Sequence, residues 1–406
     1  MQRREFLLAT NAAMSAHLLS ACAEGPGALA TDRWGVQQGY PDGWGPPGQP
    51  PRWEAYPEYR VGNFSGGFER MFRHNVTRAG RDVSSLTAAN AADGIGAAAY
   101  VRSWPVTGLL IARDGEIWFE HYGFARHAEM RLTSWSMAKS VTSLLFGIAL
   151  DRGVVRALDD TPQMYAPPLA GTLHGRIPMR HLLNMSSGAE VDHVRDPVRI
   201  DVPALLGRAE SRATGTDIER VVRGWHAVRE APGARFNYNE LCPLTIGMVI
   251  RHATGGSLAQ FAEERLWRPM GAEGDATWLT DSLGREYNCA GFAARLRDWA
   301  RLGQLIAQRG RMAGRQVVSA DWIDACLSWG AQDRQVAHGS ARPDTGYKNF
   351  FWHPRADGRW PTMNGAHGQR LVVDMTSRTV MVQTAVAAEG PWSRDFYALF
   401  DRATRA

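Results

Sequence analysis

Lysine is almost missing from this 406-residue sequence. Of its 46 lysine and arginine residues only two are lysines, Lys139 and Lys348. Arginine stays charged in proteins, whereas a lysine that is removed from water can lose its proton. A lysine retained in the segment Ser136-Met137-Ala138-Lys139 is therefore a candidate for proton chemistry, the alternative being chance. We interpret Lys348, in an expected loop, as an ordinary surface residue.

Several binding signatures are also missing. The sequence has no Cys/His spacing of a metal site, no Gly-rich phosphate loop, no run of like charges and no internal repeat. The net charge is only +5, and the acidic residues are spread along the chain. We expect no metal, no cofactor and no nucleic-acid partner. An apolar content of 44% is typical of a globular protein.

Cysteine is scarce too, with four residues at positions 22, 242, 289 and 326. If Cys22 is modified, three remain, and an odd number gives no clean disulfide framework. Pairing of Cys289 with Cys326 stays open as an alternative.

The N-terminus has the features of an export signal. Arg3 and Arg4 precede an apolar stretch that runs to about residue 21, a pattern that resembles a twin-arginine signal. The stretch is too short and too interrupted to predict a membrane span. Leu19-Ser20-Ala21-Cys22 resembles a bacterial lipobox, in which Cys22 becomes the lipidated first residue. We expect residues 1–21 to be removed and the mature protein to be lipid-anchored to the membrane in the bacterial periplasm; a soluble secreted protein and an uncleaved anchor are the alternatives.

The remaining sequence divides into a tether and one large domain. Residues 22–75 are rich in Gly, Pro and Trp, as is typical of an extended tether, and residues 76–406 form the expected domain. Apolar runs at 107–113 and 116–120 flank Asp114-Gly115, which predicts a hairpin. Residues 136–152 are apolar on nearly every side and end before a glycine, which predicts a buried helix.

The middle and the end of the chain complete the expected fold. Residues 160–285 are mostly helical in pattern, and residues 290–310 have the spacing of an amphipathic helix. Paired strands are predicted at 369–374 and 379–383, followed by a helix from about residue 393. The fold class is therefore α/β (α+β): one sheet assembled from both chain ends, with a helical lobe inserted between them.

The Ser-x-x-Lys segment is suited to nucleophilic catalysis. Residues at i and i+3 are neighbours on one face of a helix, and a serine hydroxyl needs a nearby base. Burial and the positive end of a helix are both expected to lower the pKa of Lys139. The same helix end offers free N–H groups to an oxyanion. We expect Thr133 and Ser134 to cap this helix.

Four segments, in order, resemble the penicillin-recognising serine hydrolases. This group includes class C β-lactamases, D-Ala-D-Ala carboxypeptidases, esterases and 6-aminohexanoate-dimer hydrolases. Residues 132–141 resemble its nucleophile segment, 179–188 a structural signature, 232–239 its Tyr-x-Asn box and 364–369 its third box. The resemblance covers about residue 101 to the C-terminus. It implies a β-lactamase/transpeptidase-like fold, an antiparallel sheet flanked by helices with an all-helical lobe, and an acyl-enzyme on Ser136.

The resemblance also implies roles for other residues. Tyr238 would relay the Ser136 proton and protonate the leaving group. The backbone N–H of Ala366 would join that of Ser136 in an oxyanion hole. The implied substrate-contacting residues are Asn239, Asn364, Gly365, His367, Gly368 and Gln369, although His367 is equally consistent with a structural role.

Two positions depart from the family pattern. Glu240 stands where the asparagine of Tyr-x-Asn is expected, unless Asn239 takes its role. Met363 stands where the third box carries a lysine or histidine that holds a substrate carboxylate. This departure favours a 6-aminohexanoate-dimer hydrolase or esterase that acts on a small-molecule amide or ester. The alternatives are a non-catalytic envelope binding or sensor module on the same fold, and a D-Ala-D-Ala carboxypeptidase or β-lactamase.

Overall fold

The computed structural model describes most of the chain from His74 to Ala406. The described ranges are 74–80, 86–88, 93–123, 126–192, 218–281, 283–329, 337–338, 346–355, 357–385, 387 and 390–406. The predicted export signal, Cys22 and nearly all of the predicted tether lie outside the described residues. Among the described helices, none has the length and apolar character that crossing a bilayer requires.

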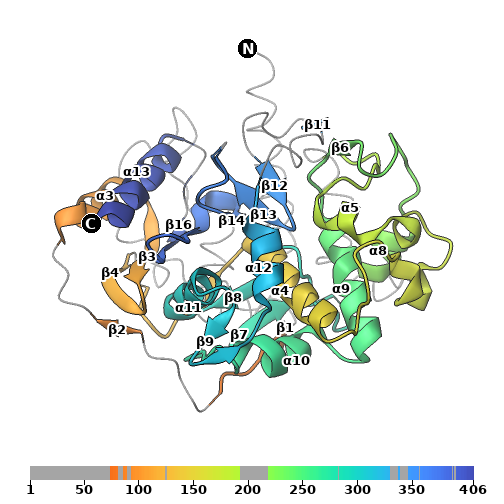
Figure 1. The fold of residues 1–406 in the computed structure, drawn as a ribbon, viewed down its shortest axis with the longest axis horizontal. Coiled ribbons are helices and arrows are strands. Elements are labelled where there is room, and N and C mark those ends of the chain that lie inside the picture. Colours follow the sequence, from red (N-terminus) through yellow and green to blue (C-terminus); the bar gives the residue numbers. More distant parts are fainter. Residues whose placement is uncertain are drawn as a thin grey trace, which may run out of the picture.

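The main sheet has eight strands taken from both ends of the chain, as predicted (Figure 1). In spatial order they are β12 (Gly346–Lys348), β13 (Phe351–His353), β14 (Thr362–Gly365), β15 (Gln369–Asp374), β16 (Thr379–Ala385), β3 (Val106–Arg113), β4 (Glu116–Tyr122) and β2 (Thr87–Ala88). All neighbours pair antiparallel except β2, which is parallel to β4. The late strand β16 lies beside the early strand β3, which closes the sheet from the two ends.

Both faces of this sheet are covered, which explains why its central strands are apolar throughout. Along β3, Leu110 and Ala112 pack into the core that contains α4 (Met137–Asp151) and α11 (Leu296–Ala307). Leu109 and Ile111 point to the other face, whose core is formed with α3 (Ala97–Ser103) and α13 (Trp392–Arg405). Successive strand residues point to opposite faces, so a strand buried on both sides needs an unbroken apolar run.

The elements with the strongest sequence patterns are present in the structure as predicted. Asp114 and Gly115 have φ values of 51° and 87°, the left-handed backbone that a tight hairpin turn requires. The buried helix predicted at 136–152 is α4, and the predicted C-terminal helix is α13. The amphipathic helix is shorter than predicted, because residues 292–294 form a strand before α11 begins.

That strand belongs to a second sheet that the sequence did not predict. Its antiparallel order is β1 (His74–Thr77), β7 (Ala276–Leu279), β8 (Phe292–Ala294) and β5 (Leu132–Thr133). These strands have only two to four residues, too few to show a periodic pattern. Strand β5 leads directly into the segment that carries Ser136.

The helical lobe lies beside α4 (Figure 1). Its described α-helices are α5 (Met179–Leu183), α8 (Ile218–Arg223), α9 (Leu241–Thr254) and α10 (Leu258–Ala262). The lobe is helical over less than the predicted 160–285, because β7 already belongs to the second sheet. Helix α9 packs directly against α4, and the active-site candidates gather where these two helices begin.

Candidate active site

Ser136 lies at the N-terminal end of α4, directly before the first helical residue. Its side chain is partly accessible, whereas Lys139 is 1% exposed. Lys139 Nζ lies 2.9 Å from Ser136 Oγ, within hydrogen-bonding distance. The helix therefore brings the predicted nucleophile and the predicted base into direct contact, as the spacing of three residues requires.

The turn before α4 is held by backbone geometry and not by the predicted side-chain caps. The Ser134 hydroxyl donates to the carbonyl of Trp135 at 2.8 Å, and the Thr133 hydroxyl has no hydrogen-bond partner among the described residues. The capping prediction is therefore wrong. Trp135 has a φ of 45°, a region that bulky residues rarely occupy and that functional sites often retain. This sharp turn sets Ser136 at the helix start.

Lys139 is surrounded by three acceptors. Besides Ser136 Oγ, its Nζ lies 3.1 Å from Glu240 Oε1 and 3.0 Å from the carbonyl oxygen of Cys289. Glu240 comes from the start of α9, and Cys289 from the loop between β7 and β8. The Tyr238 phenol is a fourth neighbour, hydrogen-bonded to the same amine.

These contacts reverse the expected titration of Lys139. Burial by itself lowers the pKa of Lys139, but the Glu240 carboxylate, with Tyr238 and Cys289, outweighs burial and raises that pKa above its ordinary value. The prediction of a lowered pKa was wrong because the sequence argument contained no carboxylate beside the amine. The resting lysine is an ammonium that is 1% exposed and ion-paired with Glu240.

Tyr238 completes the group. Its ring centroid lies 4.9 Å from Lys139 Nζ. Burial raises the pKa of the Tyr238 phenol, while the charge of Lys139 and side-chain hydrogen bonds with Ser136 and Lys139 act in the opposite direction. The Tyr238 phenol can therefore contact both Ser136 and Lys139, the two residues between which a proton would be transferred.

An aromatic wall holds the Tyr238 ring. Its centroid lies 5.9 Å from that of Tyr347 and 5.5 Å from that of Trp352, and Phe236 adds a third neighbour at 6.4 Å. Tyr347 lies on β12 and Trp352 on β13, so the edge of the main sheet supports the phenol. Trp352 is partly exposed, which leaves an aromatic surface beside Tyr238.

The structure separates the roles of Asn239 and Glu240. Asn239 is fully buried; its Oδ1 accepts from the N–H of Cys242 at 3.1 Å, and its Nδ2 donates to the carbonyl of Asn237 at 2.7 Å. It closes the first turn of α9, so its placement does not match a substrate contact. Glu240 makes no capping bond, and its carboxylate reaches Lys139 in its place.

The signature at 179–188 braces the Tyr238 loop. The N–H of Asn237 donates to the carbonyl of Met185 at 2.6 Å, and the N–H of Gly233 donates to the carbonyl of Ser186 at 2.7 Å. The Asn237 side chain donates to the carbonyl of Val191 at 3.0 Å. These bonds fix the segment that presents Tyr238 and Glu240 to Lys139.

Asn288 was missed at the sequence level. Its Nδ2 donates to the carbonyl of Pro243 at 2.6 Å and to the Thr142 hydroxyl at 3.2 Å. It thereby ties the loop that carries the Cys289 carbonyl to both α4 and α9. A lone asparagine far from every motif gives no sequence signal of this role.

The third box lies against the turn before Ser136. A Cβ atom added to Gly365 would lie 2.2 Å from the carbonyl oxygen of Ser134 and 3.0 Å from Trp135 Cβ. Only glycine permits this approach of β14. Ala366, exposed at the start of a short 3₁₀ helix (Ala366–Gly368), follows immediately. The side chain of His367 lies outside what the structure describes.

The other third-box side chains have internal partners. Gln369 is fully buried and bonds Ala366 and Ala385, and the carbonyl of Gly368 accepts from Gln383 at 3.0 Å. Asn364 accepts from Arg370 Nε at 2.8 Å, and Arg370 packs on aromatic rings of α13. Gln369 and Asn364 are thus engaged in bracing the turn and the sheet.

Met363 is fully buried in the core on the α4 side of the sheet. Its position in β14 is therefore filled by apolar packing. The open alternative of a Cys289–Cys326 disulfide is not realised: both cysteines are buried, and neither forms a disulfide. The described residues contain no cluster of three or more side chains that could hold a metal ion.

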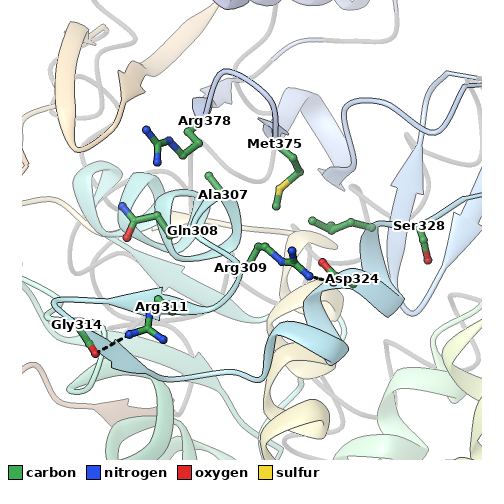
Figure 2. A pocket seen from close by; sticks show the side chains of 10 residues that line it. Ala307, Gln308, Arg309, Arg311, Gly314, Asp324, Ser328, Met375 and Arg378 are labelled. Carbon is green, nitrogen blue, oxygen red and sulfur yellow. Dashed lines mark hydrogen bonds and ion pairs between the residues drawn. The ribbon is translucent and has the colours of Figure 1, made fainter.

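Figure 2 shows a hollow of about 830 Å³ with a different lining. It is lined by Ala307, Gln308, Arg309, Arg311, Gly314, Asp324, Leu327, Ser328, Met375 and Arg378, none of them a predicted site residue. Two of its arginines are ion-paired within the chain, Arg309 with Asp324 and Arg378 with Asp114. Ser136 is not one of its lining residues.

Known proteins share this fold and parts of this sequence. The sequence model of the beta-lactamase family matches residues 102–387. The 6-aminohexanoate-dimer hydrolase of Paenarthrobacter ureafaciens is 25% identical over 294 residues, which cover 68% of this chain and 71% of that protein. A Bacillus anthracis structure with a provisional assignment as 6-aminohexanoate-dimer hydrolase has a TM-score of 0.71 at 21% identity, covering 83% of this chain and 92% of that one. A D-stereospecific amidohydrolase from Streptomyces has a TM-score of 0.54 at 19% identity, covering 75% and 95%.

Proposed function

Because the chain belongs to the beta-lactamase family, we propose that it is a serine hydrolase that cleaves an amide or ester bond of a small molecule through an acyl-enzyme on Ser136. The observation that carries this proposal is the 2.9 Å contact between Lys139 Nζ and Ser136 Oγ, with the Tyr238 ring beside the same nitrogen. A serine hydroxyl in contact with a basic group on an accessible helix end is the arrangement of an activated nucleophile.

The proposed reaction begins when the Lys139–Tyr238 pair has given up one proton. Ser136 Oγ then attacks the substrate carbonyl carbon, and its proton moves to the pair. The backbone N–H groups of Ser136 and Ala366 hold the oxyanion. As the intermediate collapses, Tyr238 donates a proton to the leaving nitrogen or oxygen, and the acyl-enzyme forms. Water repeats the same steps, releases the acid and restores Ser136.

The proposed substrate is a small amide or ester related to 6-aminohexanoate oligomers. The matched curated relative is described as a 6-aminohexanoate-dimer hydrolase, and its alignment spans more than two thirds of both chains. The buried Met363 supports the proposal against a β-lactamase or carboxypeptidase, because those enzymes use a cation there to bind the substrate carboxylate. The partly exposed Trp352 beside Tyr238 suits an apolar acyl chain.

The test is covalent labelling of the full-length protein with a fluorophosphonate, followed by mass spectrometry of the intact chain and its peptides. We expect one adduct, on Ser136, and none in Ser136→Ala. Folded wild-type protein that never labels would favour the non-catalytic binding module. Hydrolysis of a 6-aminohexanoate dimer and a short-chain ester, compared with nitrocefin and a D-Ala-D-Ala peptide, then decides the substrate class.

A further inference from the structure

Glu240 takes no part in the steps of the proposed reaction, although its side chain contacts Lys139. Glu240 is 8% exposed, and its Oε1 lies 3.1 Å from Lys139 Nζ, so the two charged groups are in direct contact. The neighbouring Asn239 already satisfies the start of α9, so the carboxylate is not needed as a cap. A charge buried this deeply is unfavourable unless its partner is fixed.

We infer that Glu240 is a positioning residue of the acyl-transfer reaction, which orients the terminal nitrogen of Lys139 and sets the pH at which the site becomes active. This inference rests on the proposed function of Ser136.

The orienting part follows from the geometry around one nitrogen. The Glu240 carboxylate and the Cys289 carbonyl can only accept hydrogen bonds, and each lies 3.0–3.1 Å from Nζ. They therefore engage two N–H groups. The third position faces Ser136 Oγ at 2.9 Å, and the Tyr238 phenol is hydrogen-bonded to both residues on this side. When Lys139 is an ammonium, this position holds a hydrogen; when it is an amine, it holds the lone pair that accepts the serine proton.

The charge part follows from what faces Lys139. Tyr238 approaches from the loop before α9, Glu240 from the start of α9 and Cys289 from the β7–β8 loop; of these groups only Glu240 has a carboxyl group. Its negative charge opposes loss of a proton from Lys139 or Tyr238, whichever of the two releases it. Removing that charge makes the deprotonated pair available at lower pH.

Two variants separate charge from position. Glu240→Gln keeps the length of the side chain and an acceptor oxygen but removes the charge, whereas Glu240→Asp keeps the charge and withdraws it by one methylene. The measurement is the rate constant for fluorophosphonate labelling of Ser136 from pH 5 to pH 10. For Glu240→Gln we expect the acidic limb of the profile to move down by about 1 to 3 pH units. For Glu240→Asp we expect an unmoved limb and a lower plateau.

The matched control is Glu120→Gln on β4, which removes a carboxylate from a partly buried pair with Arg297. Its limb should coincide with the wild type. If Glu240→Gln leaves the limb in place, the inference is overturned while Ser136 remains the nucleophile. If the wild type does not label at any pH, the proposed function itself fails. Should Glu240→Gln not fold, Glu240→Asn is the second uncharged variant, and an unmoved limb there is equally decisive against Glu240.

Discussion

At the scale of single residues, the site depends on the Lys139 amine and on neighbours of different kinds. Ser136 is on the same helix as Lys139, Glu240 starts another helix and Cys289 contributes only a backbone carbonyl. The serine and the lysine could be predicted from their spacing. The carboxylate could be recognised only as a departure from a motif, and the carbonyl gave no sequence signal at all, since any residue carries one.

Tyr238→Phe tests the proton relay without disturbing the packing. The ring remains against Tyr347 and Trp352, so we expect the free energy of unfolding to change by about 1 kcal/mol or less. Loss of the phenol should lower ester hydrolysis by about 10² to 10⁴-fold, as is typical when a general acid–base group is removed. Steady-state kinetics and urea unfolding measure the two effects.

Tyr347→Phe is the matched control for that substitution. It removes a phenol that is equally buried, from a ring 5.9 Å away that makes no hydrogen bond with Ser136 or Lys139. Activity within threefold of the wild type is expected. Equal losses in both variants would mean that the aromatic wall, and not the Tyr238 hydroxyl, limits the reaction.

At the scale of elements, prediction followed the length of the pattern. The β3–β4 hairpin, α4, β15 and β16 carry long apolar runs or a defined turn, α13 consists of helix-forming residues, and all were predicted. The second sheet consists of strands of two to four residues whose register is set by contacts between distant segments. Trp135 in the left-handed region likewise contradicts its local preference, because the site fixes the turn.

Gly365→Ala tests whether β14 must approach the nucleophile turn. The added methyl would lie 2.2 Å from the carbonyl oxygen of Ser134, a backbone atom that cannot move without shifting the turn. We expect β14 to retreat with Ala366, and labelling of Ser136 to fall by about tenfold or more because the oxyanion donors are misplaced. Gly94→Ala, where an added Cβ meets nothing within 4 Å, should label at the wild-type rate. Wild-type labelling of Gly365→Ala would exclude this strand from the oxyanion hole.

The short 3₁₀ helix at His174–Arg176 gives a prediction about stability and pH. His174 is fully buried, neither ring nitrogen has a hydrogen-bond partner among the described residues, and burial lowers the pKa of His174 to about 4. The unfolded chain, with a histidine pKa of about 6.5, binds this proton first. Stability is therefore full above about pH 6.5 and falls as the pH drops toward 4, by about 3 kcal/mol in total.

His174→Leu isolates this effect, because leucine is apolar and does not titrate. Urea unfolding at half-unit steps from pH 4 to pH 7.5 should show the wild type losing stability relative to the variant across that window. Asp298, whose pKa is raised to about 6 by burial, is present in both proteins and cancels in the difference. If the difference in free energy of unfolding between the two proteins stays constant over this pH range, burial does not lower the pKa of His174, and the prediction is wrong.

At the scale of the whole molecule, the main sheet is assembled from residues that are far apart in sequence. Thr107 on β3 and Thr384 on β16 share a hydrogen bond of 2.9 Å between their hydroxyls. The sequence has strand patterns near both ends and a helical pattern between them, and this order predicted one sheet built from both ends of the chain. Details such as the hollow in Figure 2 depend on how loops pack and could not be predicted.

The cellular localisation of the protein is a proposal that rests on the sequence alone. We propose that Arg3 and Arg4 direct export and that Cys22 carries the lipid anchor. Fractionation of the full chain in a bacterium with a twin-arginine pathway should find it in the membrane fraction, on the periplasmic side. Replacing both arginines with lysine keeps the charge but removes the recognised pair, so the protein should stay in the cytoplasm. Cys22→Ser should still be exported but should be released from the membrane, because a multiply acylated Cys22 is the proposed stable attachment. If Cys22→Ser stays in the membrane fraction, an uncleaved anchor is favoured.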